Sequence, residues 1–182
     1  MVHSPDLLES DSVRLRAMEP EDVDLLYKWE NDTNIWKVSN TVTPFSRHIL
    51  RKFIESQADD IFETRQLRLI IEEKQGGRPV GAIDLFDVDP YNRRAGVGIL
   101  IYDTMDKCQG YASSALQLII RYSFMVLNLH QLYCDLLFDN SPSLHLFRSK
   151  GFLIVGIKRE WVRTTSGWMD EYMLQLINPK KD

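Results

Sequence analysis

Residues 106–112 read Asp-Lys-Cys-Gln-Gly-Tyr-Ala, and this stretch decides how the rest of the chain is interpreted. It follows an apolar run and precedes a segment whose apolar residues recur every three or four positions, so it joins a predicted strand to a predicted helix. The first N–H groups of a helix lack intrahelical partners, and with the helix dipole they favour an anion such as a pyrophosphate. Lys107 adds a cation, and Gly110 lets the backbone approach closely. An ordinary helix start with a glycine turn explains these seven residues equally well.

A second stretch, residues 140–152, reads Asn-Ser-Pro-Ser-Leu-His-Leu-Phe-Arg-Ser-Lys-Gly-Phe and follows another predicted strand. Asn140 is a favoured N-cap residue, so plain helix capping is one interpretation of this start. The second interpretation is that it forms the other side of the same ligand site, because it lies where the first stretch requires a partner.

Together the two stretches resemble the motifs of the GNAT family of N-acetyltransferases. The first is similar to the family's Arg/Gln-x-x-Gly-x-Gly/Ala pyrophosphate motif. The second is similar to its Asn-x-x-Ser/Ala-x-x-x-Tyr-x-x-x-Gly-Phe stretch, and spacing and order match in both. Residues 121–152, which include Tyr-Ser-Phe-Met-Val-Leu-Asn-Leu-His-Gln-Leu-Tyr, look most like bacterial spermidine N-acetyltransferases and the related ribosomal-protein N-acetyltransferases.

The remaining segments show the two periodicities that mark strands and helices. Alternation predicts strands over residues 12–17, 67–73, 80–87, 94–102, 131–138, 156–164 and 168–177. Helical spacing predicts helices over residues 20–29, 45–57, 111–127 and 141–150, with a loop over residues 31–43. The sum is an α+β fold in a single domain over residues 1–182. Its GNAT-like arrangement is a mostly antiparallel, mixed central sheet with helices on both faces.

Composition excludes several classes of function. Among the 182 residues, 44% are hydrophobic and 26% are charged, which is ordinary globular composition. The net charge is −4 with both signs scattered, so no basic stripe predicts a nucleic-acid partner, and cationic substrates suit the balance better. Two cysteines and no cluster of metal-ligand spacing predict neither a disulfide framework nor a metal site. The acidic N-terminus and short apolar runs predict a cytoplasmic protein without a membrane anchor.

The resemblance implies a set of residues that bind acetyl-CoA as co-substrate. The pantetheine arm is expected along Ile99, Leu100 and Ile101. The pyrophosphate is expected on the loop and first helical turn formed by Lys107, Cys108, Gln109, Gly110, Tyr111 and Ala112. Asn140, Ser143 and Phe147 are expected to line the other side.

The chain departs from the family pattern at both positions of proton transfer. Phe147 stands where the family usually has a tyrosine, and phenylalanine cannot donate a proton to the leaving thiolate. Water, or a neighbour such as Tyr111 or Tyr102, would then supply it. Gly96 stands where spermidine acetyltransferases often carry a glutamate. Asp84 remains as the candidate base, since its neighbours in the strand point the other way, although an exposed strand carboxylate explains it as well.

Glu30 is a second candidate for the acceptor site, because it lies in a stretch read as loop and loops carry binding residues. We interpret His130 and His145 as ordinary residues, because no carboxylate is spaced to orient either ring.

The expected function is transfer of acetyl from acetyl-CoA to a primary amine by direct attack. The amine is expected to be a polyamine-like small molecule or a protein N-terminus, and a homo-oligomer is possible. The alternative is an acyl-CoA-binding module that is catalytically weak or silent, because the departures at Phe147 and Gly96 both touch catalysis.

Overall fold

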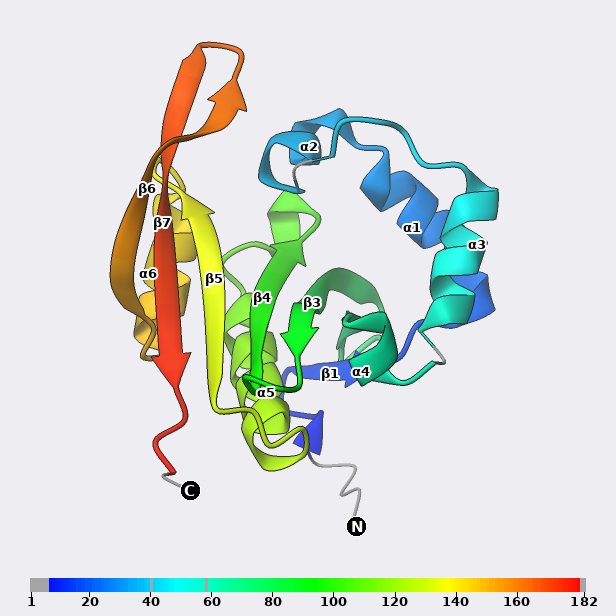
Figure 1. Ribbon diagram of the computed structural model, residues 1–182. Coiled ribbons are helices and arrows are strands. Elements are labelled where there is room, and N and C mark those ends of the chain that lie inside the picture. The colour runs from blue at the N-terminus through cyan, green and yellow to red at the C-terminus, as the bar shows by residue number, and fades with distance from the viewer. Residues whose placement is uncertain (1–6, 40, 58, 181–182) are drawn as a thin grey trace.

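A computed structural model describes residues 7–39, 41–57 and 59–180 of the chain. One seven-stranded sheet runs through it in the order β1-β2-β3-β4-β5-β7-β6 (Figure 1). Only the β4–β5 pair is parallel, and the others are antiparallel. The strands are β1 Val13–Arg16, β2 Leu67–Glu73, β3 Pro79–Asp89, β4 Arg94–Ile101, β5 Gln131–Leu137, β6 Leu153–Thr164 and β7 Gly167–Ile177. The mostly antiparallel, mixed sheet is confirmed.

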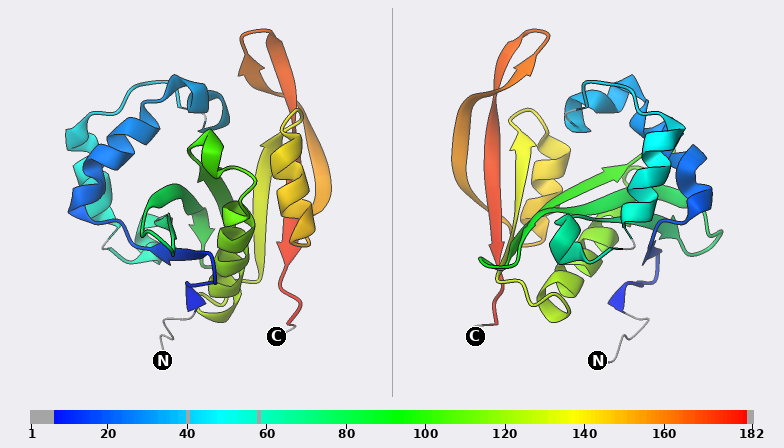
Figure 2. Two further views of the ribbon diagram at one scale, coloured as in Figure 1. Left: turned by 180° about the vertical axis from the view of Figure 1, so that it is seen from behind. Right: turned by 45° about the vertical axis from the view of Figure 1, so that its right-hand side comes forward.

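Helices cover both faces of this sheet, as predicted (Figure 2). Helix α5 (Tyr111–Met125) and helix α6 (Ser141–Ser149) lie on one face. Their apolar side chains, such as Leu116 and Ile119, pack against Ile83 and Leu85 of β3 in the larger core. On the other face, α1 (Val23–Glu30) and α3 (Arg47–Ser56) form a smaller core against Ile70 of β2, and the short helix η2 (Pro20–Asp22) leads into α1.

The loop predicted over residues 31–43 is wrong, because helix α2 (Thr33–Ser39) occupies most of it. Its sequence, TNIWKVS, contains β-branched and polar residues of low helix propensity, so no helical signal stands out. Local contacts stabilise the helix instead: the Asp32 carboxylate, directly before it, accepts from the Asn34 backbone N–H as an N-cap residue does, and Trp36 Nε1 donates to the Glu30 carbonyl at 2.8 Å. Two short elements, α4 (Ile61–Thr64) and η3 (Thr104–Asp106), were also not predicted.

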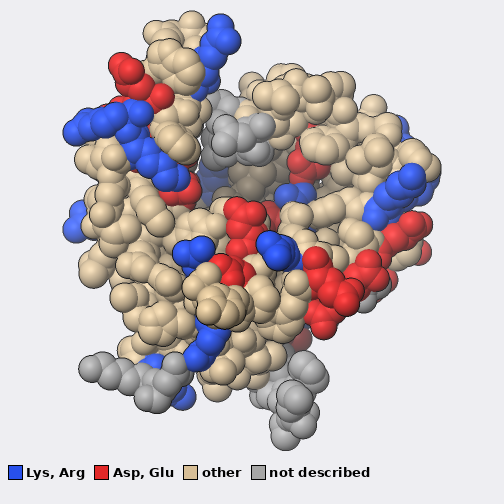
Figure 3. Space-filling model, viewed as in Figure 1, with Lys and Arg blue, Asp and Glu red and all other residues tan. Residues whose placement is uncertain are grey.

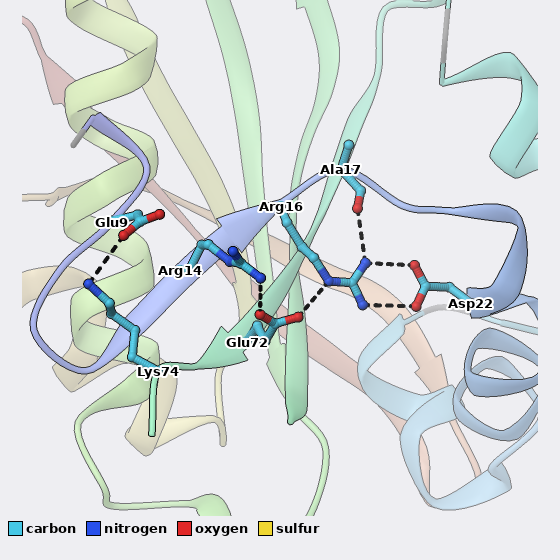
Figure 4. Close-up of polar contacts among 7 residues, drawn as sticks. All are labelled: Glu9, Arg14, Arg16, Ala17, Asp22, Glu72 and Lys74. Carbon is cyan, nitrogen blue, oxygen red and sulfur yellow. Dashed lines mark hydrogen bonds and ion pairs between the residues drawn. The ribbon is translucent and has the colours of Figure 1, made fainter. Parts of the chain in front are cut away.

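An ion-pair network fixes the edge strand β1 to its neighbours (Figure 4). Glu72 of β2 accepts from Arg14 and, at 2.7 Å, from Arg16. Arg16 also forms a two-pronged pair with Asp22 at 2.7 and 2.9 Å, so the same guanidinium ties β1 to the start of the helical layer. Glu72 and Asp22 are buried, where such paired charges resist separation because a lone buried charge is costly.

The parallel pair β4–β5 is short, and this opens a cleft between the two strands. The two strands pair only over residues 94–96 and 131–133. Beyond that point β4 continues to Ile101 and β5 to Leu137, and the strands diverge (Figure 1). The edge of β4 beyond residue 96 is therefore not paired with β5.

No helix among the described residues is long and apolar enough to cross a membrane.

Candidate active site

The loop before α5 is held in a fixed shape by a buried carboxylate. Asp106, at the end of η3, is 6% exposed and receives two hydrogen bonds from Arg78 at 2.8 and 2.7 Å. Those bonds hold the pKa of Asp106 below its ordinary value although burial opposes them, so the group stays ionised at neutral pH. Asp106 therefore supports the loop.

The backbone of this loop turns twice into the left-handed region. Cys108 has φ +64° and Gly110, the N-cap of α5, has φ +84°. A Cβ on Gly110 would meet no protein atom within 4 Å, so the glycine is required here for its conformation. Within the described residues, the N–H groups of Cys108, Gln109 and Gly110 donate no hydrogen bond. These amides, at the N-terminus of a 15-residue helix, fit an anionic phosphate group.

A cleft of about 490 Å³ lies between the diverging ends of β4 and β5. Four predicted cofactor residues line it: Ile99, Asn140, Ser143 and Phe147. Asn140 also caps α6, where its Oδ1 accepts from the Ser143 N–H at 3.3 Å, so the capping interpretation is realised. Leu100 lines a neighbouring pocket, and Ile101 packs against the larger core. Residues 107–112 do not line the cleft and lie at the start of α5.

Phe147 belongs to both the core and the cleft. The residue is 1% exposed, and its ring packs edge-on against Phe152 with centroids 5.0 Å apart. The two tyrosines considered as replacement proton donors lie outside the cleft. The Tyr102 hydroxyl donates to the Lys28 carbonyl at 3.0 Å, and the Tyr111 hydroxyl lies 3.5 Å from Glu73. The structure therefore offers neither tyrosine to a thiolate in the cleft.

A smaller pocket of about 140 Å³ adjoins the cleft on the α1 side of the sheet. The candidate acceptor residues Glu30 and Asp84 both line it, and so do Trp29 and Arg68. Asp84 faces away from its buried neighbours Ile83 and Leu85, as the alternation predicted. Asp84, Arg68, Gly98 and Ile99 line the pocket and the cleft alike, so the two spaces meet at these residues.

Arg68 joins the two candidate carboxylates. Its Nε and Nη2 donate to Asp84 at 2.6 and 3.2 Å, and its Nη1 donates to Glu30. All three side chains are less than a fifth exposed. Burial lowers the pKa of the guanidinium, but Asp84 and Glu30 outweigh it and raise that pKa above its usual value. The cluster thus holds one cation between two carboxylates, so its formal charge is negative.

Comparisons with known proteins agree with this geometry. A family model described as "Acetyltransferase (GNAT) domain" matches residues 12–153. The chain belongs to this GNAT family of acetyltransferases. An uncharacterized N-acetyltransferase p20 of Bacillus licheniformis is 30% identical over 94% of this chain and 96% of that protein. The spermidine N(1)-acetyltransferase of Escherichia coli strain K12 is 28% identical over 80% and 75%. A spermidine N-acetyltransferase structure from Vibrio cholerae, in complex with CoA and spermine, superimposes with a TM-score of 0.82 at 23% identity, covering 92% of this chain and 96% of that one.

The GNAT assignment confirms the predicted family and reaction class. The protein is an acetyltransferase that uses acetyl-CoA as co-substrate and transfers the acetyl group to an amine.

The structure of this acetyltransferase explains why position 96 is occupied by a glycine and not by a glutamate. Gly96 pairs with Phe86 of β3, and a Cβ on the glycine would lie 2.3 Å from the Phe86 ring. Phe86 in turn packs edge-on against Tyr133 of β5 at 6.0 Å. An aromatic pair therefore fills the space in which a glutamate at position 96 would stand.

The site also contains residues that sequence reasoning missed. Arg68 of β2 was not considered, although its alternation with Leu69 and Ile71 places it on the Asp84 face. Asp135, Lys158 and Glu171 line the cleft and were also missed, because three residues on separate strands give no local signal. The two histidines that were set aside, His130 and His145, are exposed and line neither space.

Proposed function

We propose that this acetyltransferase acts on a small cationic primary amine and that the Glu30–Arg68–Asp84 cluster receives it. The observation that carries the proposal is the position of Asp84, which lines both the small pocket and the cleft between β4 and β5. The excess negative charge of the cluster favours an ammonium group, and the relatives named for spermidine support the same class of acceptor.

The cofactor is proposed to bind along the divergent end of β4. The unpaired edge of β4 presents backbone groups to the pantetheine arm at Ile99, Leu100 and Ile101. The free amides of Cys108, Gln109 and Gly110 suit the pyrophosphate, with the Lys107 side chain exposed beside them. Asn140 and Ser143 of α6 form the opposite wall. Ile99 lines the cleft, and the loop lies outside it, which supports separate places for the pantetheine arm and the pyrophosphate.

The reaction is proposed to proceed by direct attack of the amine on the thioester. Asp84 holds the ammonium form and accepts its proton directly or through water, so that the neutral amine forms beside the thioester. Arg68 fixes the Asp84 carboxylate in position with two hydrogen bonds. Since the Phe147 ring cannot donate a proton, the thiolate takes its proton from water. A thiol has a reference pKa of about 8.5, so the CoA thiolate can leave without a dedicated acid.

A panel of amines tests this proposal. CoA release is followed with a thiol reagent, and the acetylated product is identified by mass spectrometry, for spermidine, monoamines, aminoglycosides and peptides with free N-termini. We expect release that depends on the amine and is fastest for small cationic amines. Exclusive acetylation of peptide N-termini would overturn the small-molecule proposal. Acetyl-CoA binding without acetylation of any amine in the panel would favour the silent binding module.

We also propose that the chain assembles with copies of itself through the β6 edge. β6 ends the sheet and pairs only with β7, and it exposes Leu153, Val155 and Ile157. Apolar edge strands readily pair with another chain. Size-exclusion chromatography with light scattering tests this, and a Val155→Lys variant should dissociate the assembly.

We place the protein in the cytoplasm, in keeping with its two free cysteines, one of them exposed.

A further inference from the structure

A glycine stands where the small pocket and the cleft meet. Gly98 of β4 lines both spaces, together with Arg68, Asp84 and Ile99. We call the opening that these four residues border the aperture. Figure 3 shows this face of the molecule hollowed between the β6–β7 hairpin and the helical half. Asp84 is the direct cross-strand partner of Gly98, so a side chain at position 98 would stand beside the Asp84 side chain on the same face of the sheet.

The other members of the aperture have side chains that are held in place. Arg68 donates two hydrogen bonds to Asp84, at 2.6 and 3.2 Å, so this wall is fixed. The Ile99 side chain packs against the larger core, because successive residues of a strand point to opposite faces. Gly98 itself is partly exposed, so a ligand in the two spaces reaches it. Position 98 is therefore the point at which β4 presents backbone without a side chain to the aperture.

Neither backbone conformation nor packing requires a glycine at position 98. The residue does not have a positive φ. Apart from its neighbours in the strand, the described atoms nearest to a Cβ on Gly98 belong to the Phe86 ring and to Asp84, at 3.8 and 3.9 Å, which are ordinary van der Waals distances. Gly96 differs, because it is buried and a Cβ there would lie 2.3 Å from the Phe86 ring. A glycine inside a strand weakens the strand and often marks a place where a ligand approaches the backbone closely.

We propose that Gly98 is a specificity-determining residue, because its missing side chain keeps the aperture open between the acceptor amine and the acetyl group. The amine at Asp84 attacks the thioester carbonyl through the aperture. The C–N bond forms, the C–S bond breaks with its electron pair on sulfur, and the proton released by the nitrogen passes to Asp84 or to water. An atom added at position 98 takes up space beside the first carbon of the acceptor. This inference rests on the proposed place of the amine at Asp84.

A conjugate that spans the aperture tests the inference without turnover. In this conjugate an acetyl bridge joins the CoA sulfur to the nitrogen of propylamine, so the propyl group reaches the small pocket through the aperture. Isothermal titration calorimetry compares the conjugate with CoA. We expect the wild type to bind the conjugate more tightly than CoA by about tenfold or more, the scale of burying two methylene groups. Gly98→Val should remove that gain, Gly98→Ala should remove part of it, and both variants should bind CoA like the wild type.

Gly156→Val is the matched control for a side chain added to a strand glycine. Gly156 lies in β6, a Cβ there meets no described atom within 4 Å, and the residue lines neither the pocket nor the cleft. This variant should keep the full gain. The inference is overturned if the conjugate binds the wild type no more tightly than CoA, or if Gly98→Val keeps the gain. It is also overturned if Gly98→Val weakens the binding of CoA and of the conjugate equally.

The two proposals fail in different experiments. The propyl group of the conjugate is uncharged, so its binding does not depend on the charge of Asp84. Turnover of amines by Asp84→Asn, measured separately, tests the proposed function. Wild-type turnover in Asp84→Asn with a lost gain in Gly98→Val would support the aperture and refute the proposed role of Asp84. Reduced turnover in Asp84→Asn with the full gain in Gly98→Val would refute the aperture alone.

Discussion

Replacing Gly110 by valine tests the proposed phosphate loop, because the structure gives a reason for the glycine that is independent of any ligand. Gly110 has φ +84°, and no protein atom lies within 4 Å of the position of a Cβ, so the substitution causes conformational strain without a clash. A residue with a Cβ in the left-handed region costs about 1–2 kcal/mol. For a chain of this size that lowers the melting temperature by about 2–8 °C. To relieve the strain, the loop must turn its amides away from the anion.

Thermal unfolding with and without acetyl-CoA measures the effect on the cofactor site. At a ligand concentration of 100 times Kd, binding stabilises the wild type by about 2.7 kcal/mol, or roughly 5–11 °C. A tenfold loss of affinity in Gly110→Val would reduce this gain by about half.

Gly77→Val is the matched control, because Gly77 has φ +66°, an equally empty Cβ position and a place in the β2–β3 turn. It should lower the melting temperature similarly and keep the full acetyl-CoA shift. If Gly110→Val also keeps the full shift, the pyrophosphate lies elsewhere.

Three further substitutions give distinct outcomes. Phe147→Tyr should raise the rate of thiol release by up to ~100-fold, because it restores a proton donor at the cleft, and loss of acetyl-CoA binding would show that the ring serves only packing. Asp106→Asn removes a carboxylate whose pKa the folded state lowers. The wild type should therefore lose stability as pH falls below about 4 and through that lowered pKa, while the variant should lack this acid-induced loss, as pH-dependent denaturation would show. Gly96→Ala should destabilise the fold by about 1–3 kcal/mol through overpacking against Phe86, and a second change, Phe86→Val, should recover most of it; denaturant titrations that show no recovery would refute this packing account.

Much of the fold was predictable because the strands and long helices carry strong periodic patterns. β2 and β3 alternate around a turn that contains Gly77, and α5 places its apolar residues on one face. Helix α2 was missed because its residues have low helix propensity and show no periodic pattern, although Asp32 directly before it is a favoured N-cap residue. The early divergence of β4 and β5 follows from strand pairing, which a periodic pattern does not contain.

The site was predictable where its chemistry lies in one contiguous stretch. The loop at residues 107–112 and the capping residue Asn140 carry local signals, and the structure places them beside the diverging strands. Arg68 changes the interpretation of Asp84, since two hydrogen bonds from the guanidinium fix the position of the carboxylate. That pairing joins β2 to β3 and α1, so only the folded chain reveals it.

The most direct test of the proposed acceptor site is the steady-state kinetics of Asp84→Asn. The substitution keeps the shape of the side chain and removes its charge, while Arg68 keeps its pair with Glu30. We predict a lower kcat for cationic amines, a higher KM for the amine and a nearly unchanged KM for acetyl-CoA, because in the proposed mechanism Asp84 holds the ammonium and accepts its proton. Turnover of every accepted amine at the wild-type rate would contradict the account, and would leave Asp84 as a strand carboxylate paired with Arg68, with the acceptor site nearer Glu30.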